Sequence, residues 1–296
     1  MGRVITVGVA VLDIILSVDG YPAENSKLRA AARRVVRGGN AANTAVVLSR
    51  LGHSCAWAGT LADDEAARLI RADLAAHGIG CTGARVHADG ATPVSYIIHN
   101  RRNASRTVIH YRGLPEYRAA DFRRIDLTGL DWCHFEGRNT AETAVMLQDA
   151  RSRSGARNPT ARLSLEVEKP RPGIEDLLPL ADLILFAREY ALAHGHDSAT
   201  AFLDAMGSRF PDKPLFCTWG GDGAWARDEN GHIHHEPAVP PPTVVDTVGA
   251  GDTFNAGVID ACLQGYTVGV ALRRASRLAG AKCGHEGFDF PLPALT

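Results

Sequence analysis

Near its C-terminal end the chain reads Thr243-Val-Val-Asp-Thr-Val-Gly-Ala-Gly-Asp-Thr-Phe-Asn-Ala-Gly257. Residues 244–245 favour a strand, residues 249–251 favour a turn, and residues 253–263 carry apolar side chains at the spacing of an amphipathic helix. A strand that runs through a glycine-rich turn into a helix presents free backbone N–H groups and the positive end of the helix dipole. The stretch therefore predicts an anion-binding site.

Asp252 is predicted to open this helix, at the mouth of the anion site. An aspartate at a helix N-terminus is commonly an N-cap, and glycine is common in strand-to-helix turns, so a purely structural role is one interpretation. A carboxylate beside a bound anion is repelled by it, however. Chemistry therefore explains Asp252 better than capping does.

The composition is that of a globular protein and excludes several classes of function. The chain has 296 residues, of which 45% are hydrophobic and 22% charged, and its net charge is -1. It offers no electrostatic reason to expect nucleic acid or an anionic membrane as a partner. No apolar run approaches the ~20 residues of a membrane span. Six scattered cysteines without a Cys-x-x-Cys pair indicate reduced thiols, and so a cytoplasmic protein.

Strands and helices alternate along most of the chain, which predicts an α/β fold with a mostly parallel sheet. The N-terminal segment predicts a buried strand over residues 3–12 that ends at Asp13, and not a signal peptide. The other predicted strands are residues 55–59, 132–135, 161–167, 183–186 and 215–219, followed by a β-hairpin over 224–236 with its turn at Asn230-Gly231. The predicted helices are residues 40–51, 64–77, 140–153 and 198–209, the first with Asn40 as a candidate N-cap.

A second β layer is predicted outside the main sheet. Residues 92–99 and 106–111 are rich in strand formers and are separated by a turn over 100–105, so they predict a hairpin. Residues 14–37 can join them, although 27–37 combine helix-favouring alanines with a Val-Val pair, and both conformations remain open. We expect one α/β unit (1–13, 38–91 and 113–296) with a small β insertion (14–37 and 92–112).

Polar side chains follow several predicted strands and turns: Asp13, Asn40, Asn43, Glu136, Glu168 and Asp252. In an open parallel sheet such loops meet at one edge. Carboxylates and amides hold sugar hydroxyls well, because they make paired hydrogen bonds. An anion site beside a hydroxyl site fits phosphoryl transfer, in which Asp252 accepts the proton of the attacking hydroxyl and the amides of residues 249–251 hold developing charge.

The predicted helix N-terminus should lower the pKa of Asp252 and make it a weak base, so orientation is expected to matter more than basicity. The sequence motifs of two other classes of nucleotide-binding protein are not matched. The chain has no Gly-x-x-x-x-Gly-Lys-Ser/Thr loop, and residues 249–254 lack the third glycine of a dinucleotide fingerprint. Three histidines flank the 224–236 hairpin turn and are expected to be surface residues: His232, His234 and His235.

Two segments together carry a family resemblance. Gly38-Gly-Asn40 and Asp246-Thr-Val-Gly-Ala-Gly-Asp-Thr-Phe254 resemble the two signatures of the ribokinase-like (PfkB) sugar kinases, in the same order and separation. The resemblance covers essentially the whole chain, and it implies a three-layer α/β/α fold with a small β-sheet lid. Further runs are similar to those of the branch of this family that phosphorylates ketohexoses: residues 136–139, 166–171, 240–247 and 282–289.

The resemblance implies that ATP phosphorylates D-fructose to fructose 1-phosphate, with Asp252 as catalytic base. It implies an anion hole made of Gly249, Ala250 and Gly251. The implied sugar-binding residues are Asp13, Asn25, Gly39, Asn40 and Asn43. The implied nucleotide contacts are Arg106, Trp219, Gly221, Gly223, Pro242, Phe254 and Cys283. Mg²⁺ would travel with ATP, and Asp246 with the carbonyl of Val248 would bind a monovalent cation, K⁺. The lid would also be a homodimer interface, a β-clasp.

The chain departs from the family pattern at two places. The frequent Asn-x-x-Glu motif is absent near residues 187–190, as it is in the ketohexose branch, which leaves the Mg²⁺ ligands unassigned. Asn25 stands where that branch carries a sugar-binding aspartate, and its amide can accept and donate hydrogen bonds but brings no charge. The alternatives are a kinase for another furanose or a nucleoside, and a noncatalytic sugar-binding protein, against which an intact Asp252 argues.

Overall fold

The computed structural model of the protein describes residues 1–103, 105–155, 158 and 160–294. Its main sheet has eight strands in the order β14-β13-β12-β11-β10-β9-β1-β4, parallel except for β13 and β14. The bounds in chain order are β1 Arg3–Val7, β4 Ser54–Ala58, β9 Trp132–Glu136, β10 Arg162–Val167, β11 Leu183–Ala187, β12 Leu215–Thr218, β13 Ala224–Arg227 and β14 Ile233–Glu236. The predicted mostly parallel sheet and the terminal hairpin are confirmed.

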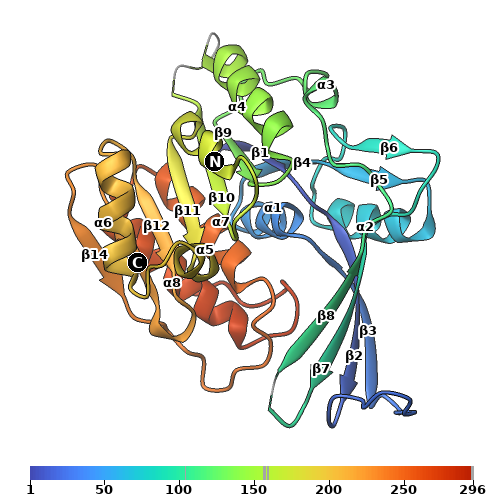
Figure 1. Ribbon diagram of the computed structural model, residues 1–296. Helices are drawn as coiled ribbons and strands as arrows, with labels where there is room; N and C mark the ends of the chain where they lie inside the picture. The colour runs from blue at the N-terminus through green and yellow to red at the C-terminus, as the bar shows by residue number, and fades with distance from the viewer. Residues whose placement is uncertain (104, 156–157, 159, 295–296) are drawn as a thin grey trace.

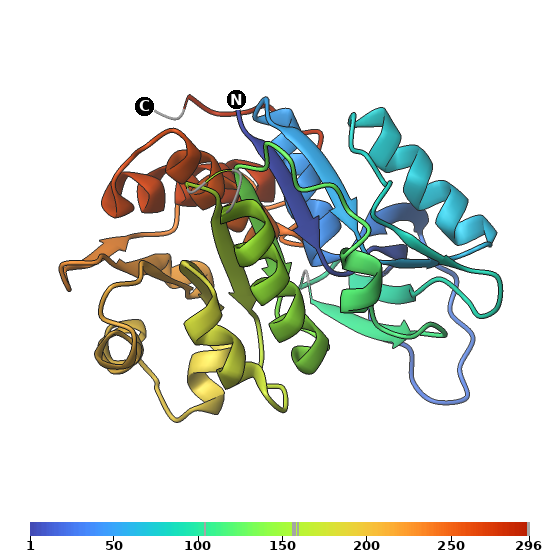
Figure 2. The ribbon, with the colours of Figure 1, turned by 90° about the horizontal axis from the view of Figure 1, so that it is seen from above.

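Helices cover both faces of the main sheet (Figure 2). Successive strand residues point to opposite faces, so Val4 belongs to one core and Ile5 to the other. The first core packs against α1 Asn40–Arg50, α2 Glu65–Ala76, α7 Ala250–Leu263 and α8 Val268–Cys283. The second packs against α3 Ala119–Phe122, α4 Thr140–Gly155, α5 Arg188–Ala193, α6 Ala199–Arg209 and the 3₁₀ helix η1 Ile174–Leu180. The three-layer architecture is thereby confirmed.

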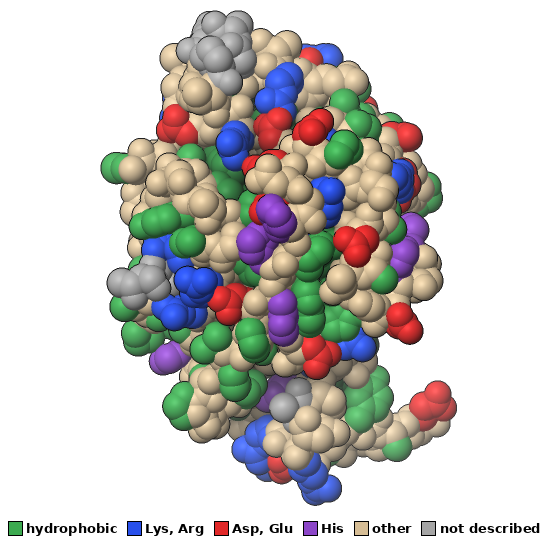
Figure 3. Space-filling view, turned by 90° about the vertical axis from the view of Figure 1, so that its left-hand side faces the viewer, with side chains coloured by type: hydrophobic (Ala, Val, Ile, Leu, Met, Phe, Trp, Pro, Cys, Tyr) green, Lys and Arg blue, Asp and Glu red, His purple; other side chains and the backbone are tan. Residues whose placement is uncertain are grey.

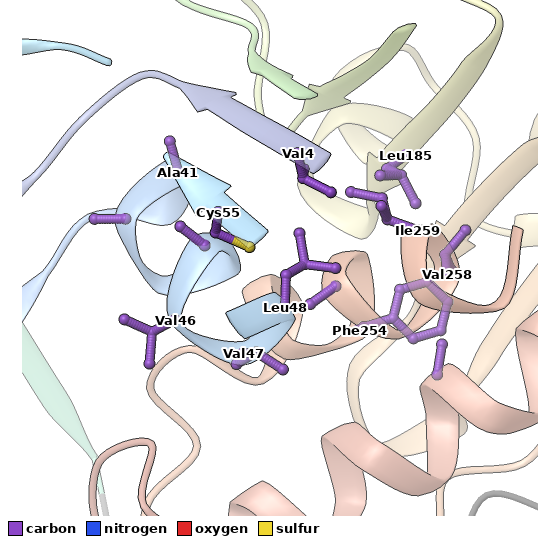
Figure 4. Packing of buried hydrophobic residues seen from close by; sticks show 14 of the residues in the cluster. Val4, Ala41, Val46, Val47, Leu48, Cys55, Leu185, Phe254, Val258 and Ile259 are labelled. Carbon is purple, nitrogen blue, oxygen red and sulfur yellow. The ribbon is translucent and has the colours of Figure 1, made fainter. Parts of the chain in front are cut away.

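Helix α7 is buried on all sides, which corrects the amphipathic helix expected there. Every residue from Asp252 to Ala261 is buried, and Figure 4 shows Phe254, Val258 and Ile259 directed into the core that α1 also fills. The helix begins at Ala250, with Gly249 as its N-cap. Residues 244–245 form no strand and are exposed. The Val245 N–H donates instead to the carbonyl of Cys283, the last residue of α8.

A four-stranded sheet in the order β3-β2-β7-β8 projects from the body (Figure 1). Its strands are β2 Val11–Val18, β3 Ala32–Gly38, β7 Val94–Asn100 and β8 Arg106–Tyr111, and we call it the lid sheet. The predicted second sheet is confirmed, and residues 32–37 of the open 27–37 segment are strand. Of the predicted 100–105 turn, residue 104 lies outside the described residues. A two-stranded sheet, β5 Thr60–Ala62 with β6 Arg85–His87, completes the fold with the short 3₁₀ turn η2 Gly220–Asp222.

The single strand expected over residues 3–12 is two strands in different sheets. Strand β1 ends at Val7, and β2 begins at Val11, where the Leu12 N–H donates to the carbonyl of Pro93 in the lid segment. Asp13 therefore lies within the lid sheet and not at the end of a core strand. An apolar run gives no information about which sheet its backbone pairs with. The division of the chain into two units stays a prediction.

Candidate active site

A pocket of about 530 Å³ lies between the C-terminal ends of the core strands and the inner face of the lid sheet. It is lined by nine of the residues predicted for the site: Asp13, Gly39, Asn40, Asn43, Arg106, Val248, Gly249, Gly251 and Asp252. Strands β9 to β12 deliver further lining residues at their C-terminal ends, where open parallel sheets bind ligands. The two sequence segments on which the family resemblance rests thus meet in one cavity.

A chain of hydrogen bonds fixes the carboxylate of Asp252 in this pocket. Asp252 is only 7% exposed, and its Oδ2 accepts a hydrogen bond of 2.6 Å from Asn43 Nδ2. The Oδ1 of Asn43 accepts in turn from the guanidinium of Arg37, which also holds Asp73. The orientation of the Asn43 amide is therefore determined, and one oxygen of Asp252 is held while the other remains available for substrate.

Burial, together with repulsion from the carboxylates of Glu136 and Glu168, raises the pKa of Asp252 from 3.8 to about 7 against the opposing effects of Asn43 and Arg37. The lowered pKa expected from the helix N-terminus is therefore wrong. Loss of hydration and repulsion between carboxylates outweigh the helix dipole at this buried position. A base whose pKa lies near neutral pH is matched to proton transfer at that pH.

The pH profile of the reaction tests this reversal. In the phosphoryl transfer predicted from the sequence, Asp252 must be ionised to accept a proton, so kcat/KM is expected to fall below pH 7, with an apparent pKa near that value. Asn43→Ala removes a hydrogen bond to the carboxylate and should move this acid limb to higher pH, whereas Glu168→Gln removes a repulsive charge and should move it lower. Rate measurements between pH 5 and 9 on the three proteins suffice. An acid limb near pH 4 in the wild type would contradict the assignment.

The turn before α7 exposes fewer free amides than expected. The first helical hydrogen bond runs from the Thr253 N–H to the Gly249 carbonyl at 2.9 Å, and the Ala250 N–H donates to the Thr247 carbonyl at 3.3 Å. The N–H groups of Gly249, Gly251 and Asp252 precede the helical ladder, and all three residues line the pocket. Of the residues predicted for the anion hole, Gly249 and Gly251 thus line the pocket, whereas the Ala250 N–H is already bonded within the turn.

Asn40 and Glu166 form a second polar pair in the pocket. Asn40 is the first residue of α1 and makes no capping bond, which corrects its predicted role as N-cap. Its Nδ2 donates to Glu166 Oε1 at 3.1 Å, so its own carbonyl oxygen is left to accept from a ligand. Burial and the neighbouring carboxylates, Asp252 first among them, raise the pKa of Glu166 well above its ordinary value.

Two strand-end carboxylates that were expected at this edge of the sheet, Glu136 and Glu168, line the pocket. Four further lining residues were not assigned to the site from sequence: Arg138, Glu166, Lys169 and Glu189. Glu136 Oε2 accepts the Val9 N–H at 2.8 Å, which ties β9 to the link between the two sheets. The sequence shows only that a carboxylate follows a strand, and this pattern does not distinguish a buried carboxylate from a solvated one. Glu189 lies on α5, where the absent Asn-x-x-Glu motif would fall.

Arg106 connects the lid sheet to the loop before the anion site. Its Nη1 donates to the Thr247 Oγ1 at 3.2 Å, across 141 residues of sequence. Arg106 and Val108 both face the pocket from β8. A guanidinium in this position can reach phosphate oxygens held by the turn before α7.

The structure does not bring the other predicted residues into the pocket: Asn25, Ala250, Trp219, Gly221, Gly223, Pro242, Phe254, Cys283 and Asp246. Phe254 and Trp219 are 2% and 6% exposed, since each packs in a core, Phe254 edge-on to Phe216. Asn25 lies in the exposed β2–β3 turn with φ 58°. A Cβ on Gly223 would lie 2.2 Å from the Glu236 carbonyl, so this glycine serves the β-turn geometry.

Asp246 is already neutralised by side chains of the protein. Lys282, which is fully buried, places Nζ 2.8 Å from the Asp246 carbonyl oxygen and 3.4 Å from its Oδ2. Arg34 lies 3.9 Å from the same Oδ2, and Oδ1 accepts the Val248 N–H at 2.9 Å. Among the described residues, no group of three or more His, Cys, Asp or Glu side chains is arranged to hold a metal ion.

The molecular surface matches the composition. Acidic and basic side chains are interspersed over the face shown in Figure 3, and all six cysteines are free thiols. Within the described residues, none of the helices combines the length and apolar character needed to cross a membrane.

Comparison with known sequences supports one family over the whole chain. The profile of the pfkB family carbohydrate kinases matches residues 1–295. The chain is 40% identical to ketohexokinase of Mus musculus over 292 residues, which cover 97% of this chain and 98% of that protein. It is 29% identical to an ATP-dependent ribose-1-phosphate kinase of Halopiger xanaduensis, over 97% of this chain and 94% of that one.

Solved structures show the same fold. Arabidopsis thaliana ribokinase, solved with ribose and ATP, superposes with a TM-score of 0.78 at 18% identity, over 97% of this chain and 94% of that chain. A nucleoside kinase of Burkholderia thailandensis, in complex with inosine, gives a TM-score of 0.73 at 20% identity, over 97% and 92% of the two chains.

Proposed function

This chain belongs to the pfkB family of carbohydrate kinases, and we propose that it uses ATP to phosphorylate a ketohexose, D-fructose, at the 1-hydroxyl. One observation carries the proposal: a buried carboxylate of raised pKa, Asp252, lies directly behind a turn with free amides in a pocket rich in carboxylate and amide groups. The enzyme is an ATP-dependent sugar kinase, and the similarity to mouse ketohexokinase favours a ketohexose among the sugars.

In the proposed reaction, the sugar lies against Asp13, Gly39, Asn40 and Asn43. Its attacking hydroxyl donates to Asp252, which accepts the proton as the phosphoryl group is transferred. The Gly251 and Asp252 amides and the Arg106 guanidinium hold the charge of the phosphoryl oxygens. Since the backbone amides are positioned by the turn and the helix, they need little reorganisation during transfer.

A substrate panel tests the proposed function. With ATP, D-fructose should be turned over, and NMR of the product should place phosphate on the 1-hydroxyl. The panel also contains D-tagatose, D-ribose, inosine and adenosine, which represent the other furanose and nucleoside kinases of this fold. Turnover of ribose or a nucleoside without turnover of fructose would reject the ketohexose assignment but keep the kinase. Sugar binding without any turnover would favour a noncatalytic protein.

The nucleotide is proposed to enter where β11 and β12 end beside α7, since Ala187, Thr218 and Asn255 line that end of the pocket. Mg²⁺ is proposed to arrive on the ATP phosphates, because it usually keeps several waters and binds through one or two carboxylates plus phosphate oxygens. Glu166 and Glu168 are pocket carboxylates of suitable chemistry. The contacts assigned to Gly221, Pro242 and Cys283 stay predictions.

A monovalent cation does not fit Asp246 in the observed arrangement, because the Lys282 ammonium occupies its carbonyl and carboxylate oxygens. We propose that K⁺ binds Asp246 and the Val248 carbonyl only by displacing Lys282. Lys282→Met should then lower the KCl concentration that gives half-maximal rate, and KCl should raise its Tm more than that of the wild type, with choline chloride as the reference salt. Identical KCl dependence in the two proteins would contradict this competition.

The lid sheet is proposed to form a homodimer interface. Three large side chains on its outer face are exposed, Tyr96 (47%), Ile109 (56%) and Tyr111 (57%), on a sheet whose edge strand β8 is unpaired on one side in the described chain. Ile109→Glu should convert a dimer into a monomer in sedimentation. A monomeric wild type would reject the interface.

The proposal also includes a cytoplasmic location, where ATP is available and free thiols persist.

A further inference from the structure

Three polar side chains form a straight row across the inner face of the lid sheet. Asp13 on β2 is the cross-strand partner of Ser95 on β7, and Ser95 is the cross-strand partner of His110 on β8. All three line the main pocket. Side chains of directly paired residues lie close enough to interact. A contact that His110 makes on β8 is therefore linked through Ser95 to the carboxylate of Asp13 on β2.

Hydrogen-bond chemistry fixes the direction of this row. An ionised carboxylate only accepts, so the Ser95 hydroxyl donates its single proton to Asp13. The Ser95 oxygen, 3.2 Å from His110 Nδ1, must then accept from that ring nitrogen. A neutral imidazole that carries its proton on Nδ1 has a bare acceptor at Nε2.

The surroundings keep this imidazole neutral. Partial burial and the nearby cations of Arg112, Arg138 and Lys169 lower the pKa of His110, against the weaker opposing effect of Glu116. Asp13 has a pKa of about 6, because burial raises it, so it is ionised above that pH. At neutral pH both groups are therefore in the protonation states that the row requires.

His110 lies where its free Nε2 acceptor can meet the sugar. Arg106, Val108 and His110 alternate along β8 and face the pocket together. Arg106 reaches the phosphate end through Thr247, whereas His110 is joined to Asp13 at the end where the sugar is proposed to lie. Strand β8 is exposed along its whole length, so the imidazole does not serve packing.

We propose that His110 is a further sugar-binding residue, whose Nε2 accepts a hydrogen bond from one hydroxyl of the sugar and whose ring is oriented by Ser95 and Asp13. This inference rests on the proposed sugar kinase activity. In this proposal the lid sheet binds the sugar through His110 and the phosphates through Arg106. A site built around such an acceptor discriminates against analogues that lack the matching hydroxyl.

Two isosteric substitutions separate the ring nitrogens. His110→Asn keeps an amide nitrogen near Nδ1 and can still bond Ser95, but it has no group at Nε2. His110→Gln places its amide near Nε2 and loses the Ser95 contact. His99→Asn is the matched control, since His99 lies on β7 of the same sheet and does not line the pocket.

The expected result is that His110→Asn raises the KM for D-fructose about tenfold, the effect of one lost neutral hydrogen bond. The kcat and the KM for ATP should stay within twofold of wild type. His110→Gln should recover part of the affinity, and His99→Asn should behave as wild type. With a series of monodeoxy-D-fructoses, wild type and His110→Asn should give equal KM values for one analogue, the one that lacks the hydroxyl bound by Nε2.

Two outcomes would overturn the inference: an unchanged KM for fructose in His110→Asn, or a tenfold difference that persists with every deoxy analogue. The latter would show that His110 acts only on the shape of the lid. If wild-type protein does not turn over fructose, the proposed substrate fails instead, and the same variants are compared with the panel sugar that is turned over. Binding of that sugar without ATP, measured by calorimetry, provides a readout independent of turnover.

Discussion

Asp252→Asn is expected to lower kcat by about 10²-fold or more while D-fructose still binds, because a positioned base contributes about 10²- to 10⁴-fold. The amide keeps the size of the carboxylate and can still accept from Asn43, so the pocket should retain its shape. Steady-state rates and calorimetric sugar binding measure the two effects separately. Unchanged turnover would remove Asp252 from the mechanism.

The same substitution is expected to raise the Tm at pH 8. The folded-state pKa of Asp252 is about 7 and its ordinary value is 3.8. Between these values the native protein binds the extra proton, so stability falls as pH rises from about 4 to 7, by at most about 4 kcal/mol for three pKa units. The asparagine carries no such cost. At pH 4 the two proteins should therefore differ least in Tm.

Asp260→Asn is the matched control on the same helix. Asp260 is also buried, but it accepts from His53 at 3.0 Å and lies near Arg274, so its charge is compensated, and it does not line the pocket. Removing one charge of a buried pair destabilises a protein. We expect Asp260→Asn to lower the Tm and to keep kcat, the opposite of Asp252→Asn. A rise in Tm in both variants would contradict the proposed charge balance.

Gly249→Ala is expected to reduce kcat/KM about 10²-fold and to lower the Tm. Gly249 has φ 78°, a region that disfavours any residue with a Cβ. A Cβ there would also lie 2.3 Å from the Phe288 ring, which packs beside Lys282 and Arg37. Relieving the clash moves the turn that aims the amides, and a misplacement of about 1 Å can cost 10²-fold in rate.

Gly251→Ala separates backbone strain from phosphate approach. No atom of the described residues lies within 4 Å of a Cβ at Gly251, and its φ is not in the left-handed region. Its Tm should match wild type, and any loss should appear as a higher KM for ATP, because the methyl group points into the pocket. Wild-type Tm and kcat in Gly249→Ala would show that the turn tolerates a side chain and would reject the strain argument.

The pocket concentrates buried carboxylates whose ionisation destabilises the folded state, and the rest of the fold must offset this loss of stability. Burial raises the pKa values of Asp13, Glu136, Glu166 and Asp252, and several of these carboxylates repel one another. Such groups are disfavoured as charged species in a folded core. Their concentration in one cavity follows the general tendency of perturbed carboxylates to mark functional sites.

Local patterns predicted most of the fold from sequence alone. Alternating apolar segments gave the parallel sheet and its helices, and two β-rich runs around a turn gave the lid hairpin, because periodicity and turn chemistry act over a few residues. The glycine-rich turn and the order of the two signature segments predicted the anion site and the family. The errors lie where backbone pairing is non-local, as at residues 3–12, which enter two sheets, and at residues 244–245, which enter none.

The chemistry of the site was decided by the tertiary structure. Asn43 and Asp252 are 209 residues apart, and only folding gives them a shared hydrogen bond. The helix dipole that suggested a low pKa for Asp252 is visible in the sequence, whereas the burial and the neighbouring carboxylates that raise it are not. The sequence thus determined that an anion turn with a carboxylate exists. Folding determined that the pKa of this carboxylate lies near neutral pH, because that pKa depends on solvent exclusion and on distant residues brought beside it.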